Sequence, residues 1–324
     1  MKKNTIFGPK QVRFNFNPDV KKDSVFNSPT NGEYGESKPV FRLGANYQVG
    51  ELTFLRASWG QGYRFPTIAE TFISTNAGGL KIKPNPVLTS ETGWTAELGI
   101  KQGFKIANFN GFVDGAAFWS QYSNMMEFQF NSAFTKFATS FADFINFQSI
   151  NVGNTVIKGF EVSVMGQGRI GEVTPSVLVG YTYINPQYRD FDPARDTVSS
   201  SSGENVLKYR FRHNIKFDTE LAYKFISFGV SVQYSSFTEA VDNILAPGES
   251  LAGIPTLLPF VGFTRFRNDH PNGYTLVDLR AAYRPIDKVK ISVILANAFN
   301  EEYAVRPALL EAPRNLAFRI DWKF

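Results

Sequence analysis

The C-terminal residues of the chain alternate between apolar and polar side chains at every position. Residues 314–324 would place five large apolar side chains on one face of an extended chain: Leu316, Phe318, Ile320, Trp322 and Phe324. The other face would carry the intervening residues, which include Arg319, Asp321 and Lys323. Strict alternation over this length predicts a β-strand with one apolar and one polar face.

The same period of two recurs along most of the chain. In clear or weaker form it predicts eleven strands, at residues 40–48, 51–59, 91–101, 109–122, 148–165, 172–185, 209–224, 227–237, 273–284, 289–297 and 314–324. No stretch of ten or more residues keeps a convincing helical period, although residues 132–145 are ambiguous. The predicted fold class is therefore all-β.

The gaps between the predicted strands are alternately long and short. The long gaps are residues 60–90, 123–147, 186–205, 238–272 and 298–313, and the short ones are 49–50, 102–108, 166–171, 225–226 and 285–288. In an antiparallel sheet this order puts every long loop at one end, which is typical of bacterial outer-membrane barrels with short periplasmic turns. The strands also reach about 9–11 residues, the length that crosses a bilayer at a tilt.

Charged side chains on one face of a single predicted strand argue against a two-layer soluble sheet. In residues 209–224 they are Arg210, Arg212, Lys216, Asp218 and Glu220. A protein core would not tolerate this face, whereas a water-filled lumen would solvate it. We therefore expect a transmembrane antiparallel β-barrel wall with Tyr and Trp girdles near the strand ends. The alternative is a soluble antiparallel sheet with one solvated face.

Composition excludes several classes of site. The chain has no cysteine, so it has no disulfide framework, no cysteine-based zinc or iron–sulfur site and no cysteine nucleophile. Its net charge of +5 comes from basic residues spread along the chain, which does not predict nucleic-acid binding. The two histidines, His213 and His270, accompany no catalytic or metal-binding motif. We predict no catalytic residue, no metal site, no cofactor and no enzymatic activity, and we place His213 in an aromatic girdle.

The number of predicted strands is odd, whereas single-chain bacterial barrels have even numbers. Residues 1–39 are polar and turn-rich, and we expect an irregular external segment with at most one strand near residues 11–16. Residues 40–324 would then be the C-terminal portion of a larger barrel, whose missing strands come from an upstream segment or another chain. We expect the isolated chain not to form a stable closed barrel. The alternative is a twelfth strand within residues 1–39 that closes a small barrel.

Two segments after the second predicted strand carry a specific series of residues. Residues 59–72 read WGQGYRFPTIAETF, and residues 85–103 read NPVLTSETGWTAELGIKQG. The series consists of Arg64, Pro66, Thr67 and Glu70, then Asn85, Pro86, Leu88 and Glu91, then Glu97 and Gly99. In this order it resembles the C-terminal barrel of the TonB-dependent outer-membrane receptors, and residues 118–128, 151–164 and 207–217 resemble later strands of that family.

The resemblance implies a barrel of about 22 strands, filled by an N-terminal plug domain that this chain lacks. About half of the barrel wall, 11–12 strands, would come from this chain. The implied function is energy-coupled import of a scarce solute (siderophore, cobalamin, glycan or peptide) through the outer membrane. The implied partners are outer-membrane lipid, the solute, the missing barrel strands and a TonB-type energy-transducing protein that acts through the plug. Alternatives are a scaffold subunit of a larger outer-membrane complex and a plug-less porin.

The resemblance and the local pattern together suggest roles for individual residues. Phe324 matches the terminal aromatic residue that the barrel-assembly machinery recognises in the family. Arg64 and Glu70 are expected to fix loop and lumen geometry rather than to contact a ligand, and the ligand-binding residues stay unknown. The G-x-G-x-x-G pattern at residues 166–171 is predicted to be a hairpin turn, because a dinucleotide site needs a following helix. Aromatic residues in the long loops predict either loop packing, which we favour, or a ligand-binding surface.

Overall fold

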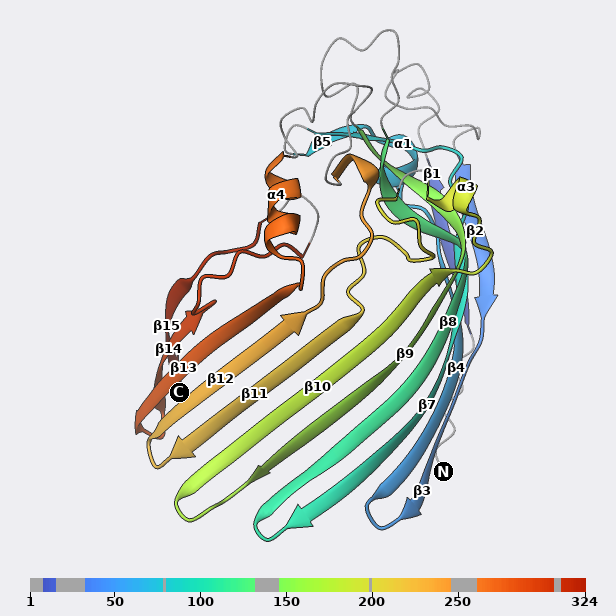
Figure 1. The fold of residues 1–324 in the computed structure, drawn as a ribbon. Helices are drawn as coiled ribbons and strands as arrows, with labels where there is room; N and C mark the ends of the chain where they lie inside the picture. The colour runs from blue at the N-terminus through green and yellow to red at the C-terminus, as the bar shows by residue number, and fades with distance from the viewer. Residues whose placement is uncertain are drawn as a thin grey trace.

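The computed structural model describes residues 8–15, 33–77, 80–131, 146–197, 200–245, 261–305 and 310–324. A curved antiparallel sheet dominates it, in which eleven long strands follow one another in chain order (Figure 1). The strands are β3 (Arg42–Gly50), β4 (Thr53–Arg64), β7 (Glu91–Ile106), β8 (Phe109–Asn131), β9 (Asn146–Gly168), β10 (Val173–Tyr188), β11 (His213–Tyr223), β12 (Ile226–Ser235), β13 (Tyr274–Ile286), β14 (Val289–Ala296) and β15 (Asn315–Trp322). The all-β fold class and the order of the eleven predicted strands are confirmed.

The connections lie as their lengths predicted. Short turns join the strands at the lower edge of the sheet in Figure 1, and the long connections gather at the upper edge. The long connections contain short elements: α1 (Ile68–Phe72), β5 (Thr75–Ala77), β6 (Leu80–Lys83), α3 (Pro193–Asp196), the 3-10 helix η2 (Asn243–Leu245) and α4 (Val261–Asp269). The ambiguous residues 132–145 lie outside the described part of the chain.

The N-terminal segment holds two strands where the sequence indicated at most one. β1 (Gly8–Asn15) pairs antiparallel with β2 (Glu33–Val40). β2 continues through Phe41 into β3, and the Phe41 carbonyl accepts a hydrogen bond from the Gln61 amide at 2.8 Å. Prolines and glycines interrupt the alternation here, so the period of two does not reveal these strands.

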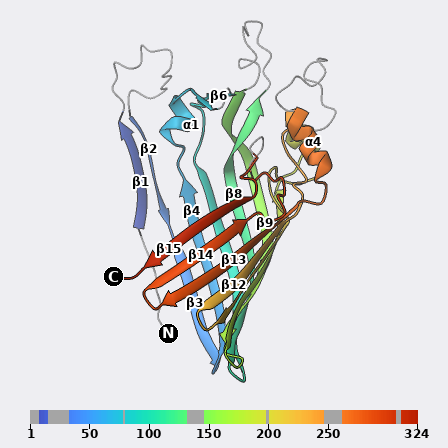
Figure 2. The ribbon, with the colours of Figure 1, turned by 90° about the vertical axis from the view of Figure 1, so that its left-hand side faces the viewer.

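The sheet does not close on itself within the described residues. β15 pairs with β14, while β1 pairs with β2, so the alternative of a small closed barrel is wrong for the part of the chain that the structure describes. Figure 2 shows β13, β14 and β15 passing in front of β4 and β8. The sheet therefore bends round like part of a barrel wall.

The two faces of the sheet differ sharply. The face that we call the membrane face carries exposed apolar side chains on every long strand; on β15, Leu316 is 56% exposed, Phe318 73% and Ile320 70%. No second layer of described residues covers these side chains. A soluble protein exposes few contiguous apolar patches of this extent, so hydrocarbon is the environment that suits this face. The soluble-sheet alternative is therefore wrong.

The opposite face, the lumen face, pairs its charges across strands. Arg56 on β4 donates to Glu97 on β7 at 2.8 Å and to Asp114 on β8 at 2.7 Å. Gly99 lies under this arginine, because a Cβ atom there would come within 2.7 Å of the Arg56 guanidinium carbon. Arg280 on β13 repeats the arrangement: it binds Asp218 on β11 at 2.8 Å and lies over Gly229 on β12.

The start of β11 differs from the prediction, and it determines where Arg210, Arg212 and His213 lie. β11 begins at His213, so Arg210 and Arg212 belong to the preceding loop and not to a charged strand face. The irregularity comes from Tyr209, whose φ of 59° breaks the extended chain. His213 lies among aromatic rings, and its Nδ1 atom is 2.8 Å from the Tyr181 hydroxyl.

The glycine pattern at residues 166–171 forms the β9–β10 hairpin. The pairing of the two strands begins next to the turn, where Gln167 lies opposite Ser176. Gly171 lies in the turn itself, with a φ of 59°. A left-handed turn residue is the usual role of glycine there. The hairpin prediction is confirmed.

Among the described residues, no helix combines the length and the apolar character needed to cross a bilayer.

Candidate functional site

Four of the residues singled out in the sequence meet at the start of α1. Thr67 caps the helix: its hydroxyl accepts from the Glu70 amide at 3.2 Å, and the Glu70 carboxylate accepts from the Thr67 amide at 2.9 Å. This reciprocal pair is a capping box, which satisfies helix donors that otherwise lack partners. Arg64 donates to the same carboxylate, and Pro66 is buried beside it.

The Glu70 carboxylate is buried and fully engaged. The residue is 7% exposed, and the Ser149 hydroxyl on β9 donates to it at 3.1 Å. Burial alone favours the neutral acid, but hydrogen bonds from Thr67 and the charge of Arg64 outweigh it and hold the pKa of the Glu70 carboxyl below its ordinary value. We call this arrangement of Arg64, Thr67, Glu70 and Ser149 the α1 clamp.

The next residues of the series fasten the loop to the sheet. The Asn85 amide donates to the Glu70 carbonyl at 2.7 Å, and its side chain donates to the Ser149 carbonyl at 2.8 Å. Pro86 opens the turn that follows. Glu91, the first residue of β7, accepts from the Met126 amide on β8 at 2.7 Å.

The remaining singled-out residues lie elsewhere. Glu97 and Gly99 belong to the Arg56 group on the lumen face, apart from the α1 clamp. Phe324 follows β15 at the end of the chain, where its exposed ring lies 6.1 Å from the ring of Trp322. Its role in barrel assembly stays a prediction.

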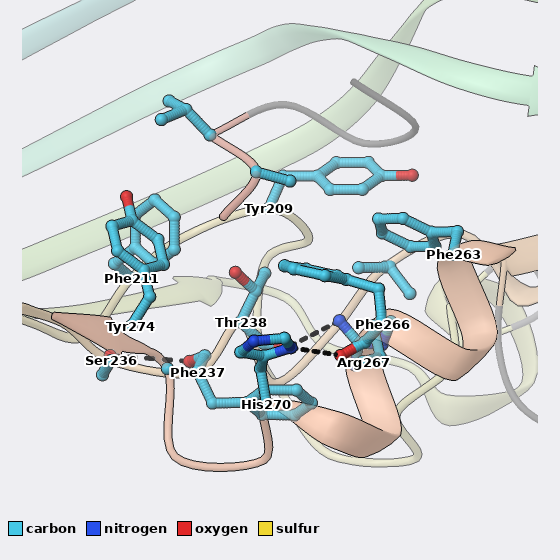
Figure 3. Close-up of a pocket in the computed structure, with 14 residues that line it drawn as sticks. Tyr209, Phe211, Ser236, Phe237, Thr238, Phe263, Phe266, Arg267, His270 and Tyr274 are labelled. Carbon is cyan, nitrogen blue, oxygen red and sulfur yellow. Dashed lines mark hydrogen bonds between the residues drawn. The ribbon is translucent and has the colours of Figure 1, made fainter. Parts of the chain in front are cut away.

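A second site, which sequence reasoning did not identify, lies between α4 and the loop ends of β11, β12 and β13 (Figure 3). It is a partly enclosed cavity of about 50 Å³. Its walls are mainly aromatic: Tyr209, Phe211, Phe237, Phe263, Phe266 and Tyr274. We call it the α4 pocket.

Arg267 brings a buried positive charge to the α4 pocket. The residue is 9% exposed, its Nη1 donates to the Thr238 carbonyl at 3.1 Å, and its guanidinium carbon lies 4.4 Å from the centre of the Phe237 ring. Within the described chain no carboxylate forms an ion pair with it. Burial lowers the pKa of the Arg267 guanidinium, although an arginine keeps its charge in proteins.

His270 forms the neighbouring wall. Its Nδ1 lies 2.9 Å from the Phe266 carbonyl, and its ring stacks on the Phe266 ring with centres 4.5 Å apart. The nearest carboxylate, Glu301, is 4.0 Å from His270 Nε2. The described residues that line the pocket are thus mainly aromatic and include Arg267 and His270 but no Asp or Glu.

A buried ion pair holds one wall of the pocket in place. Lys208 Nζ lies 2.5 Å from Asp242, and the two side chains are 1% and 2% exposed. The Tyr209 hydroxyl donates to Asp242 at 2.6 Å, and the Phe130 amide on β8 donates to it at 3.3 Å. The pair joins two loops to the extension of β8; its partners are far apart in sequence, so no local pattern could have predicted it.

The aromatic residues of the predicted long loops divide between buried positions and the wall of the α4 pocket, and a ligand-binding role for them stays a prediction. Phe72, Phe130 and Tyr188 are buried, and the structure places Phe130 in the extension of β8 and Tyr188 at the end of β10. Phe263 and Phe266 line the α4 pocket. Five further phenylalanines of the predicted long loops, at residues 134, 137, 141, 144 and 260, lie outside the described residues. In the described part of the chain, no three His, Asp or Glu side chains come close enough to hold a metal ion.

A family model for the "TonB dependent receptor-like, beta-barrel" domain matches residues 11–300. The chain belongs to this family. TonB-dependent receptors act as receptors and transporters, and their barrels lie in the outer membrane of Gram-negative bacteria. The resemblance found in the motif series is therefore confirmed.

The curated relatives are longer than this chain, and each match covers a larger share of this chain than of the relative. The chain is 22% identical over 294 residues to a probable hemoglobin and hemoglobin-haptoglobin-binding protein 1 of Haemophilus influenzae, which is 81% of this chain and 27% of that protein. It is 24% identical over 147 residues to a hemoglobin-haptoglobin-binding protein A of Haemophilus influenzae, 43% of this chain and 14% of the relative. The chain spans only about a quarter of the longer match.

Solved structures of TonB-dependent receptors share the fold. The copper transporter OprC superposes with a TM-score of 0.63 and 16% identity, over 99% of this chain and 45% of that one. The ferric-catecholate import receptor Fiu of E. coli K12 gives a TM-score of 0.59 and 16% identity, over 97% and 40%. The hemophore receptor HasR of Serratia marcescens, solved with its hemophore and heme, gives 0.52 and 14%, over 99% and 47%. Each aligns with this chain over less than half of its own length, as a partial barrel wall would.

Proposed function

We propose that this chain forms the C-terminal wall and outer loops of an outer-membrane receptor that imports a scarce solute by energy-coupled transport. The observation that carries the proposal is the sheet itself. It presents a bare apolar face to its surroundings and pairs its charges on the other face, in a chain of the TonB-dependent receptor family. A closed wall of this kind separates hydrocarbon from a wet lumen.

In this function the chain performs no covalent chemistry. Other parts of the receptor supply the remaining strands and the plug, and a TonB-type energy-transducing protein acts on that plug. The outer loops, held by the α1 clamp and by the Lys208–Asp242 pair, shape the entrance through which the solute arrives.

The named ligands of similar proteins support a metal-bearing solute. The curated relatives bind hemoglobin, and the similar structures include importers of copper and of ferric catecholates. Within the solute classes implied by the motif series, this support favours a siderophore-like or heme-like cargo over a glycan or a peptide.

The test is uptake by the intact receptor in its native host. Deleting the gene should abolish uptake of the radiolabelled metal complex at nanomolar concentration, and the gene on a plasmid should restore it. Collapse of the proton-motive force should block the restored uptake. Uptake that persists without the proton-motive force would instead support the plug-less porin.

The scaffold alternative makes a different prediction. A structural subunit should co-purify from detergent-solubilised outer membranes in fixed ratio with other chains, and its deletion should alter the complex without altering uptake. Fractionation of the membranes tests the proposed location at the same time.

A further inference from the structure

The α4 pocket combines a small cavity, aromatic walls and a buried arginine without a carboxylate partner among the described residues. We propose that this pocket binds a carboxylate arm, a CH2–COO⁻ group, of the small solute that the receptor captures. The proposal rests on the proposed function for the origin of the ligand, but the pocket's affinity for a carboxylate can be measured without transport.

The size of the cavity limits the group that can enter. Its volume is about 50 Å³. One water molecule needs roughly 10–15 Å³ in the same measure, so the cavity has room for about four non-hydrogen atoms. A carboxylate and the methylene group that carries it have this number of atoms. A whole aromatic ring with its carboxylate would need the walls to move.

The charge of the pocket determines the sign of the ligand. A guanidinium has five N–H donors in a planar fork, and the Thr238 carbonyl accepts from Nη1 only. The remaining donors can meet both oxygens of one carboxylate, which is the geometry that favours arginine over lysine at such sites. A buried cation without a counter-charge is costly, so an entering anion relieves that cost.

The walls strengthen this preference. The Phe237 ring lies against the guanidinium, Phe266 lines the pocket on the α4 side, and Arg267 is 9% exposed (Figure 3). An ion pair is stronger where aromatic side chains replace water. A phosphate group would bring nearly two charges to one arginine, so a monoanionic carboxylate matches the pocket better.

The experiment uses the intact receptor, purified in detergent, with propionate as the probe and propionamide as its neutral isostere. Binding is followed by saturation-transfer NMR. We expect the wild type to bind propionate and to ignore propionamide, and Arg267→Gln to weaken propionate binding at least tenfold. Arg265→Gln is the matched control on the same helix: Arg265 faces solvent with its side chain 83% exposed, so its loss should leave binding unchanged.

A second variant tests the proposal even if Arg267→Gln fails to fold. Ala304 lines the cavity, and Ala304→Phe should fill it and block propionate while Arg267 keeps its charge. Heat-modifiable migration in gels confirms that each variant remains folded. Equal binding of propionate and propionamide, or undiminished propionate binding by a folded Arg267→Gln or Ala304→Phe variant, would overturn the proposal. Transport that fails while propionate binding follows these expectations would count against the proposed function alone.

Discussion

Two long connections of this chain each contain a helix beside a key arginine, Arg64 at the end of β4 and Arg267 within α4, and the two arginines have opposite surroundings. In the α1 clamp, Arg64 meets the buried carboxylate of Glu70, which Thr67 and Ser149 also bind. In the α4 pocket, Arg267 is itself buried and lacks a carboxylate partner within the described residues. In the α1 clamp the charges of Arg64 and Glu70 balance each other. In the α4 pocket we propose that the N–H donors of Arg267 not used by Thr238 are available to an anion.

The difference teaches how to separate structural from ligand-binding charges in such loops. A charge whose partners all belong to the same chain contributes mainly to stability. A buried charge without a counter-ion lowers stability and raises affinity for an anion. Substitutions in the two regions should therefore change different measured quantities.

The largest stability effect is expected for Glu70→Ala. The substitution leaves Arg64 without its counter-charge and removes the acceptor of the Thr67 amide and the Ser149 hydroxyl. The Arg64 side chain is 44% exposed, so water screens its unpaired charge, and the loss comes mainly from the hydrogen bonds of the buried carboxylate; we expect it to cost about 2–3 kcal/mol. Hydrogen exchange of the loop amides in residues 68–91 measures the loss. The control is Glu172→Ala at a short turn, where the exposed pair with Lys224 should contribute less than about 1 kcal/mol.

Thr67→Ala should have a smaller effect in the same region. It removes the hydroxyl that caps α1 but keeps the Glu70 carboxylate. The loss of a helix cap costs about 1 kcal/mol. Protease nicking of the loop should increase accordingly, and Thr67→Ser should restore protection. Equal nicking of wild type and Thr67→Ala would show that the cap does not stabilise the loop.

Acidification should weaken the α1 clamp specifically. The folded pKa of Glu70 is below its ordinary value. The carboxylate therefore contributes stability above the ordinary carboxyl pKa of about 4.3, and this contribution is lost as pH falls through the folded pKa. The protection factors of the residue 68–91 amides, which correct for the intrinsic slowing of amide exchange in acid, should fall as pH drops below about 5. Glu70→Gln should remove this pH dependence, and an unchanged pH profile in that variant would contradict the assignment.

Arg267→Gln should have the smallest effect on stability, in contrast to its effect on binding. Removing a buried charge that lacks a counter-ion is stabilising, but the lost hydrogen bond to Thr238 and the lost contact with Phe237 offset this gain, so we expect a net change of about 1 kcal/mol or less. Thermal unfolding of the purified receptor, followed by circular dichroism, measures it. A strong destabilisation would place Arg267 with Arg64 as a structural residue and would erase the contrast between the two regions.

Much of the fold follows from the sequence, because each strand is long and its neighbours along the chain are its neighbours in space. The period of two therefore predicts both the position of each strand and the face on which each side chain lies. Leu316, Phe318 and Ile320 lie on the apolar face of β15, as predicted. The N-terminal hairpin was missed because proline and glycine interrupt its pattern. Arg210 and Arg212 were placed on a strand face because alternation cannot show that Tyr209 turns the chain.

The two candidate sites also differ in how close their residues lie along the chain. The α1 clamp was predicted in part, because the motif series singled out Arg64, Thr67 and Glu70 within seven positions. The helix, its capping box and the contact with Ser149 were not predicted, since Ser149 is far away in the chain. The α4 pocket draws its walls from residues between Tyr209 and Val305. Its Arg267 has no distinctive neighbours in the chain, so only the packing of three strand ends against α4 reveals it.

The glycines beneath the lumen arginines set the clearance inside the wall. The guanidinium of Arg56 lies over Gly99 and that of Arg280 over Gly229, so both groups are close to the backbone of the sheet. A side chain at either glycine would lift the guanidinium off the sheet and narrow the passage from one side. The glycines in the wall thus leave room for the paired arginines and keep the passage on the lumen face wide.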